Sequence, residues 1–360
     1  MRHIRFLILL SILLILLTSG CRAKDQVGNE TSSQAQGQTE LFIMTHDSFS
    51  ASEDLISAFE KANNVKLTFI KSGDAGAVVN RAILTKENPL ADVLYGVDNN
   101  FLSRALEEDL FEAYKSPELQ NIPEIYLLDP TNKALPVDFG DVCINYDKQF
   151  FEANHLPIPE TLEDLLRKEY DGLLVVENPA TSSPGLAFLM TTIAHFGEDG
   201  YLDYWEKLAG NGVVVVNDWE TAYYTNFSGS SGQGDQPMVV SYGSSPPAEV
   251  IFAEKPLEDS ITASLVGEDM CYRQVELAGI LKGTEHLEMA KKFIDFMLSV
   301  PFQEDMPLQM FVFPVNGMAN LPEEFVKYAQ IPEKPVQIDP RLIAENRSKW
   351  IEDWTEVVLR

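Results

Sequence analysis

The sequence predicts an α/β protein rich in parallel strands. Short apolar segments of strand length alternate with amphipathic segments of helical periodicity over most of the 360 residues, a rhythm typical of parallel sheets covered by helices. Apolar residues make up 45% of the chain and aromatic residues 10%, which is the composition of a folded globular protein. The length beyond the first 20 residues suits one large domain or two ordinary ones.

The elements are expected in chain order. Apolar, β-branched runs predict strands at 41–44, 65–70, 92–95, 173–176, 213–216 and 238–241. Helical periodicity predicts helices at 52–62, 77–85, 186–193, 286–298 and 341–357. Ser52 is an N-cap residue type in front of the first helix, and the last helix carries Trp350 and Trp354 four residues apart, on one face.

The N-terminus predicts export. Arg2 and Arg5 precede the run from Phe6 to Leu17, which is apolar except for one serine. This run is too short to cross a membrane, which takes about 20 residues, and it fits the apolar region of a secretory signal. Small residues lead into Cys21 and resemble a bacterial lipoprotein signal over residues 1–20, which implies acylation of Cys21. An ordinary secretory signal or an uncleaved anchor is the alternative. Residues 21–39 have the polar composition of a flexible tether.

The charge excludes some classes of partner. The chain carries 27 basic and 55 acidic residues, a net charge of −28, and loss of Arg2 and Arg5 with the signal makes it −30. Such a surface repels nucleic acid and anionic lipid. It weakly favours cationic ligands, although acidic faces also serve solubility. The chain contains no P-loop, GxGxxG or GxSxG motif, and its histidines have no metal-ligand spacing. We therefore expect no metal site and no enzyme activity.

Two cysteines remain after Cys21. Cys143 and Cys271 both stand in apolar surroundings, and we expect them to be buried thiols and not a disulfide.

Four predicted strand exits are polar and aromatic, at residues 45–49, 178–185, 216–220 and 241–246. Ligands of α/β folds bind at such exits. Ser182 or Ser183 can cap the following helix, and hydroxyls with free amides at a helix start also suit an anion. Trp219 and Tyr242 suit either a core lid or stacking on a flat cation.

These loops carry a resemblance to the thiamine-binding proteins of bacterial thiamine ABC transporters, from about Leu41 to Val357. The segments that carry it are Asp47-Ser48-Phe49, Ala91-Asp92-Val93, Gly96 to Asn100, Asp138-Phe139-Gly140, Tyr146-Asp147-Lys148, Thr181 to Leu186, Trp219, Ser241-Tyr242, Ser245-Pro246, Phe313-Pro314-Val315 and the helix with Trp350 and Trp354.

The resemblance implies a two-lobed periplasmic-binding-protein-like fold of type 2, which closes on thiamine, thiamine monophosphate or thiamine diphosphate in the cleft between its lobes. The implied lobes are 40–138 with 272–330, and 139–271, while the lobe of 331–360 stays open. Strands crossing after Asp138-Phe139-Gly140 and near Cys271 to Glu276 would form the hinge. The implied partners are an ABC permease and a membrane reached only through the lipid anchor, and the protein is expected to be an exported monomer.

The resemblance also implies the ligand contacts. By position these are Asp74, Ala75, Ser182, Ser183, Trp219, Tyr242, Gly243, Ser244 and Ser245, with His46 and Phe311 as further candidates. The aromatic residues would hold the rings, Asp74 the charge, and the serines the hydroxyl or phosphate. The chain departs from the family pattern at Phe311 in place of Trp, at Ala248 in place of a ring, and at His46 in place of Tyr.

Three alternatives stay open. Ferric-ion binding proteins share this architecture, and Tyr223-Tyr224 could hold iron, although a partly buried helix face is the favoured explanation of the pair. A polyamine would suit the acidity, but the loops carry more hydroxyls than carboxylates. A surface hydrolase would need Ser182 or Ser244 beside a histidine base, and no spacing predicts one.

Overall fold

The computed structural model describes residues 38–231 and 233–360. The predicted signal peptide, Cys21 and nearly all of the tether lie outside them. The strands form one sheet in the order β2-β1-β3-β10-β5-β8-β6-β7, with β4, β9 and β11 beside it. No helix of the described residues is long and apolar enough to cross a membrane.

The first lobe is built on three parallel strands, in which β1 pairs with β2 and β3. These strands are β1 (Thr39–Thr45), β2 (Val65–Lys71) and β3 (Val93–Asp98). The helices of this lobe are α1 (Glu53–Asn63), α2 (Ala75–Leu84), α3 (Leu102–Glu107), α9 (Leu287–Leu298) and α10 (Val300–Gln309). Helix α11 (Glu323–Tyr328) buries Phe325 beside Phe313 and also packs against α8 (Pro246–Ile251). Apolar faces of α9 and α10 join β1, β3 and β10 in one buried cluster.

The second lobe repeats the plan with another parallel set, in which β6 pairs with β7 and β8. Its strands are β6 (Leu174–Glu177), β7 (Val214–Val216), β8 (Met238–Tyr242) and β9 (Thr262–Leu265). Its helices are α4 (Lys148–Ala153), α5 (Ser183–Phe196), α6 (Tyr201–Gly210), α7 (Ser228–Ser231) and α8 (Pro246–Ile251). Helix α5 is buried along nearly its whole length.

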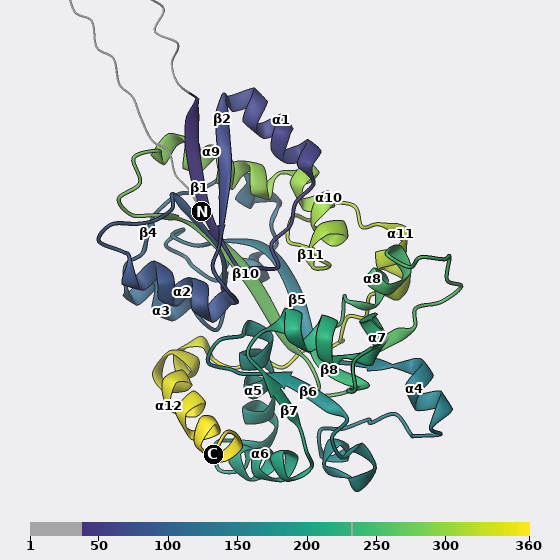
Figure 1. Cartoon of the computed structure of the whole chain (residues 1–360). Coiled ribbons are helices and arrows are strands. Elements are labelled where there is room, and N and C mark those ends of the chain that lie inside the picture. Colours follow the sequence, from purple (N-terminus) through teal and green to yellow (C-terminus); the bar gives the residue numbers. More distant parts are fainter. Residues whose placement is uncertain (1–37, 232) are drawn as a thin grey trace, which may run out of the picture. The chain divides into compact units, whose positions relative to one another are not determined.

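Two long antiparallel strands connect the lobes, β5 (Leu135–Asp147) and β10 (Tyr272–Leu281). Figure 1 shows both running from the upper group of elements to the lower one. The short strands β4 (Phe111–Glu112) and β11 (Phe313–Pro314) pair with them. Glu276 stands directly opposite Asp138 in this ladder, so the predicted crossing segments lie side by side. The hinge motion and the exact lobe boundaries stay predictions.

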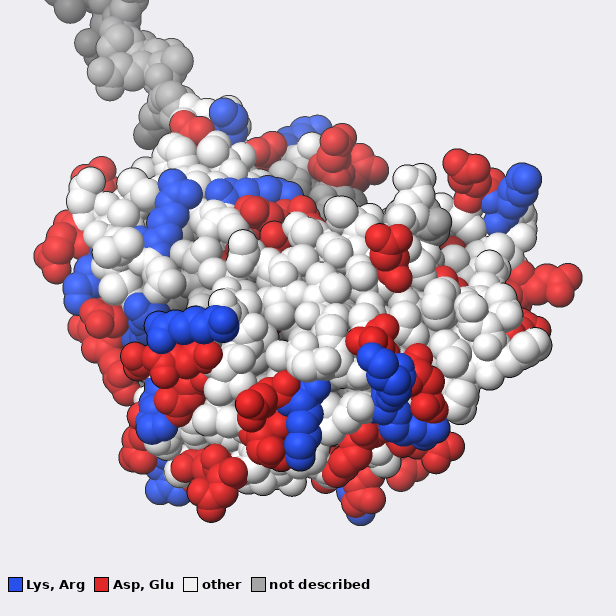
Figure 2. All heavy atoms as spheres, turned by 60° about the horizontal axis from the view of Figure 1, so that its bottom comes forward, with Lys and Arg blue, Asp and Glu red and all other residues white. Residues whose placement is uncertain are grey.

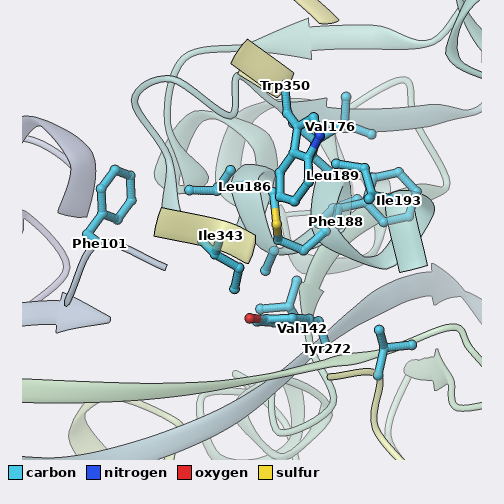
Figure 3. Close-up of a cluster of buried hydrophobic side chains, with 14 of the residues drawn as sticks. Phe101, Val142, Val176, Leu186, Phe188, Leu189, Ile193, Tyr272, Ile343 and Trp350 are labelled. Carbon is cyan, nitrogen blue, oxygen red and sulfur yellow. The ribbon is translucent and has the colours of Figure 1, made fainter. Parts of the chain in front are cut away.

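The C-terminal helix α12 (Pro340–Val358) packs mainly on the second lobe. Trp354 meets Trp205 of α6 edge-on, with ring centroids 5.4 Å apart. Figure 3 shows Trp350 and Ile343 of α12 beside Leu186 and Leu189 of α5. The sequence did not decide which lobe residues 331–360 belong to, and this packing places their helix on the second lobe.

The predicted elements are present, but the sheet is mixed. Its two outer parts are parallel, as predicted, while its centre is antiparallel because β5 and β10 run against their neighbours. Helix α2 begins at Ala75, two residues earlier than predicted, because Asp74 caps it by accepting a hydrogen bond from the Ala75 amide at 2.9 Å.

The prediction of two buried thiols is wrong. Cys143 and Cys271 form a disulfide, with their Cα atoms 4.4 Å apart. The cause is the register of β5 and β10. Because Val142 pairs with Tyr272, Cys143, which follows Val142, stands beside Cys271, which precedes Tyr272. Their separation of 128 residues hides this proximity in the sequence.

The surface shows how the acidic excess is distributed. Figure 2 shows basic and acidic side chains interspersed around one face, with a broad uncharged area between them. Local pairs such as Lys207 with Asp203 on α6 account for part of this mixture. An acidic surface of this mixed kind is compatible with a role in solubility.

Candidate functional site

One pocket lies where the strand exits of both lobes meet. The first lobe contributes the exit of β1, the start of α2 and the end of α10, and the second lobe contributes the start of α5 and the segments after β7 and β8. Seven of the predicted site residues line it, namely His46, Asp74, Ser183, Trp219, Tyr242, Ser245 and Phe311. The other four, Ala75, Ser182, Gly243 and Ser244, are buried neighbours of lining residues and do not line it.

The aromatic wall is built around Trp219. Its indole Nε1 donates a hydrogen bond to Ser241 Oγ at 2.9 Å, which fixes the ring relative to β8. Tyr223 stacks on the indole with centroids 5.1 Å apart and an interplanar angle of 21°. Tyr242 stands edge-on at 6.4 Å. The wall thus presents electron-rich rings, which attract flat and cationic groups.

Two glycines allow the rings of this site to lie against the backbone. A Cβ on Gly140 of β5 would stand 2.6 Å from the ring of Tyr242. A Cβ on Gly96 of β3 would stand 2.6 Å from the imidazole of His46, and Gly96 also has a φ of +98°, which favours glycine. Both ring positions therefore depend on the absence of a side chain on the neighbouring strand.

Asp74 supplies an acidic group at the start of α2. Burial raises the pKa of this carboxyl, although the nearby Ser182 hydroxyl and the hydrogen bond from the Ala75 amide act in the opposite direction. The same residue lines a small neighbouring hollow together with Asp47, Asp218 and Glu220. These acidic groups beside the pocket complement a positively charged ligand.

A second acidic group was missed by the sequence prediction. Glu276 of β10 lines the pocket and is 6% exposed. Its Oε2 lies 3.5 Å from His46 Nε2. Burial disfavours the imidazolium, but the Glu276 carboxylate outweighs it and raises the pKa of His46. The available signal was a glutamate between Val275 and Leu277 inside an apolar strand, because buried charges of this kind need a specific reason.

The serines occupy the start of α5 and the loop after β8. Ser182 stands at the N-cap of α5, one of the two predicted positions, but its side chain makes no capping hydrogen bond. Ser183 is 1% exposed, and its Oγ has no hydrogen-bond partner among the described residues. Ser245 Oγ lies 3.1 Å from Ser241 Oγ. The first turn of α5 thus offers a free hydroxyl beside a helix N-terminus, where negative charge is favoured.

Phe311 also lines the pocket. It follows α10 with a φ of +56°, a left-handed conformation that costs a bulky residue roughly 1–2 kcal/mol. Its ring meets Phe252, which stands one helical turn beyond Ala248 at the end of α8, with centroids 5.4 Å apart. Residues of both lobes therefore meet at this rim, where Ala248 also lines the pocket.

The tyrosine pair considered for iron also lines the pocket. It lies in a π-helix, Thr221–Asn226, where Tyr223 is buried and Tyr224 is exposed. Tyr223 donates a hydrogen bond to Glu249 Oε1 at 2.8 Å, and its ring is occupied by the stack on Trp219. Within residues 38–231 and 233–360, no three His, Cys, Asp or Glu side chains are grouped so as to hold a metal ion.

Comparisons with known proteins give one consistent family. The model of the family described as bacterial extracellular solute-binding protein matches residues 88–336. The thiamine-binding periplasmic protein of Escherichia coli (strain K12) is 30% identical over 325 residues, which cover 89% of this chain and 94% of that protein. The protein of the same description from Brucella melitensis biotype 1 is 29% identical over 337 residues, with coverages of 91% and 94%.

The comparison with solved structures agrees with the sequence comparison. A periplasmic thiamin binding protein superposes on this chain with a TM-score of 0.78 at 28% sequence identity, and the match covers 89% of this chain and 96% of that chain. The likeness therefore extends over both lobes and the strands between them.

Proposed function

The chain belongs to the family of bacterial extracellular solute-binding proteins, and on this premise we propose that it captures thiamine or a thiamine phosphate and delivers it to an ABC permease. Proteins of this family bind solutes, so we propose a transport role without catalysis. The relatives at about 30% identity carry the name thiamine-binding periplasmic protein, which supports thiamine as the ligand.

One observation carries the proposal: stacked aromatic rings and buried carboxyl groups line the same pocket. Thiamine combines a flat aminopyrimidine with a thiazolium ring that is permanently cationic. Trp219 and Tyr242 are suited to the rings, while Asp74 and Glu276 are suited to the positive charge. Phe311 would complete the enclosure from the other lobe, in a strained conformation typical of functional sites.

The serines are proposed to read the hydroxyethyl arm of thiamine or its phosphate. The free Ser183 hydroxyl and the start of α5 support this assignment, because a helix N-terminus with available donors binds anionic oxygen. Ser182, Ser244, Gly243 and Ala75 would act through their backbone or by shaping these loops.

The location and assembly are proposed from the sequence. We propose that residues 1–20 direct export and that acylated Cys21 anchors the protein to the membrane through residues 21–39. The protein would act as a monomer, with the ligand enclosed between its two lobes and the closed form presented to the permease. Mass spectrometry of the membrane-extracted protein tests the anchor, because an acylated N-terminal cysteine adds the mass of its lipid chains.

Calorimetric titration of the purified protein tests the ligand. Thiamine and its mono- and diphosphate are the test ligands, with iron(III) citrate and spermidine as controls for the alternative classes. Submicromolar binding of at least one thiamine form is expected, since a site that encloses a flat cation between rings and carboxylates gains several contacts at once. Binding of iron or spermidine with no response to any thiamine form would refute the proposal.

A further inference from the structure

A chain of buried ionisable groups runs inward from the pocket wall. Tyr95 Oη lies 2.9 Å from Glu276 Oε2 and 2.6 Å from Asp138 Oδ2. Asp138 and Tyr95 are completely buried, and Glu276 is exposed only where it lines the pocket. The three residues come from three neighbouring strands, β3, β5 and β10, so this arrangement is held by the sheet itself.

The number of hydrogen atoms requires an additional proton in this chain. A phenol has one hydrogen and can donate to only one of the two carboxyl oxygens. The other short contact needs a carboxyl O–H that donates to Tyr95 Oη. Asp138 is the group suited to hold it, because its Oδ1 has no hydrogen-bond partner among the described residues and an ionised form would be poorly satisfied there.

The surroundings support this placement of the proton. Burial, and then the charge of Glu276, raise the pKa of Asp138 well above its usual range. Burial also acts against ionisation of Glu276, but the neighbouring His46 prevails and lowers the pKa of Glu276. In this arrangement Asp138 donates to Tyr95, Tyr95 donates to the Glu276 carboxylate, and Glu276 faces the pocket beside His46.

Other charged groups lie near Asp138, Tyr95 and Glu276 but do not neutralise these three side chains. Asp98 of β3 adds a further buried carboxyl, and Asp74 and Lys71 act on His46 from α2 and β2. Tyr242 of β8 reaches Gln274, which contacts Glu276.

The remaining neighbours bring no basic group to Asp138, Tyr95 or Glu276. Arg273 is paired with Asp141 at 2.8 Å, β11 places Pro314 opposite Asp138, and α10 contributes Gln303, which donates to the Val137 carbonyl. In the part of the chain that the structure describes, no lysine or arginine forms an ion pair with Asp138 or Glu276.

We propose that the Asp138–Tyr95–Glu276 chain is a proton-exchange site, which holds one proton while the pocket is empty and releases it when a cationic ligand enters. The O–H bond of Asp138 breaks, its electron pair stays on the carboxylate, and its proton passes to Tyr95 Oη. The hydrogen of Tyr95 leaves through Glu276, at the pocket wall, to solvent, so that Tyr95 then donates to Asp138 and the Glu276 carboxylate is left to face the ligand. The ligand's positive charge replaces the proton, so the site selects a permanent cation over a neutral molecule of the same shape. The inference rests on the proposed function, since thiamine supplies that cation.

Calorimetry in several buffers measures the proton directly. Thiamine is titrated into the protein at pH 7 in PIPES, HEPES and Tricine, whose ionisation enthalpies differ, and the slope of the observed enthalpy against the buffer enthalpy gives the protons released. We expect release of up to about one proton per thiamine, and an affinity that rises by up to about tenfold per pH unit between pH 6 and 8. The neutral analogue with a thiophene ring in place of thiazolium should bind more weakly and release no proton.

Two variants locate the proton. Asp138→Asn keeps the shape but cannot ionise, so proton release and the pH dependence of the affinity should both be lost. Glu276→Gln should weaken thiamine binding and lessen the release. Asp92→Asn is the matched control, because Asp92 is a buried aspartate directly before β3 that does not line the pocket. Its carboxyl oxygens contact Phe42 N, Thr284 and His286. The control should behave as the unmodified protein.

The outcomes separate the two proposals. Absence of thiamine binding in every buffer overturns the proposed function and the inference with it. Binding with a heat that does not depend on the buffer overturns the inference alone, as does a release that persists in Asp138→Asn. Infrared difference spectra of the unmodified protein need no variant: loss of a protonated carboxyl C=O band on thiamine binding supports the inference, and an unchanged band overturns it.

Discussion

At the scale of single residues, the pocket combines groups that a solvated surface would not keep together. Glu276 and His46 are both buried at its wall, and Trp219 is fixed by a hydrogen bond at its edge and a stacked ring on its face. Such preorganisation lowers the entropic cost of ordering side chains on binding.

Trp219→Ala should weaken thiamine binding by roughly 1–3 kcal/mol with little change in fold stability, because a desolvated cation–π contact and a central aromatic anchor are lost while the indole is only half-buried. Titration calorimetry measures the affinity and thermal unfolding measures the stability. Trp219→Phe, which keeps a ring, is the control and should lose less. Unchanged affinity in the alanine variant would remove Trp219 from the site.

Asp98→Asn should stabilise the protein more at pH 8 than at pH 5. Burial, and then the charge of Glu276, raise the pKa of Asp98 to about 7. The folded state therefore binds this proton more tightly than the unfolded state, and the stability of the unmodified protein falls as the pH rises from the unfolded pKa toward 7. Asparagine removes this cost, on the order of 4 kcal/mol at most, and keeps an oxygen acceptor for the Asn100 and Phe101 amides.

Denaturant unfolding at both pH values measures the difference between Asp98→Asn and the unmodified protein. A stability difference that is the same at pH 5 and pH 8 would contradict the assigned shift in pKa.

At the scale of elements, the site depends on how closely neighbouring strands approach. The ring of Tyr242 on β8 lies over Gly140 on β5, and the ring of His46 after β1 lies over Gly96 on β3. In each case one strand leaves space for a ring carried by another, so the sheet sets the ring positions of the pocket.

Gly140→Ala should weaken thiamine binding by about tenfold, which is about 1.4 kcal/mol, because its Cβ would stand 2.6 Å from the Tyr242 ring and displace it. Calorimetry with thiamine gives the change. Gly210→Ala is the matched control, since a Cβ at this position of α6 meets nothing within 4 Å and alanine favours the helix. An equal effect of both substitutions would show that the contact with Tyr242 is unimportant.

Local patterns predicted the outer strands and the helices α1, α2, α5, α9 and α12, because these elements bury one face or run through the core. The other helices of the described residues, among them α6 and α10, were not predicted. The aromatic site residues were also predictable, since Trp219 and Tyr242 follow short apolar strands whose exits gather at one edge of a sheet. Strand β5 was not predicted from its local pattern, because Pro136, Gly140 and two aspartates in its interior interrupt the apolar residues. Glu276 was missed for a related reason: it reaches the pocket from the middle of a strand, and only the pairing of β10 with β3 and β5 places it there.

At the scale of the whole molecule, both lobes contribute to the pocket and touch beside it. Gly76 of α2 leaves room for the backbone oxygens of Ala180 and Thr181 from the second lobe, which a Cβ would approach to 3.1 and 3.0 Å. Helix α12 packs on the second lobe, while its Arg347 donates a hydrogen bond to the Asn100 carbonyl of the first at 3.0 Å. These contacts and the strands β5 and β10 are the connections that a proposed opening and closing would work against.

The disulfide Cys143–Cys271 joins those two connecting strands and should stabilise the molecule as a whole. It closes a segment of 128 residues that contains most of the second lobe, and restricting a long segment in the unfolded chain is worth about 2–4 kcal/mol. The double variant Cys143→Ser with Cys271→Ser should therefore unfold at lower denaturant concentration by that free energy, with thiamine binding retained because neither cysteine lines the pocket. Reductant should destabilise the unmodified protein to the same extent and leave the double variant unchanged, and thiol titration of the unreduced, denatured protein should detect neither cysteine as free. Two free thiols at these positions, or equal stability of both proteins without reductant, would show that the strands are held together without this bond.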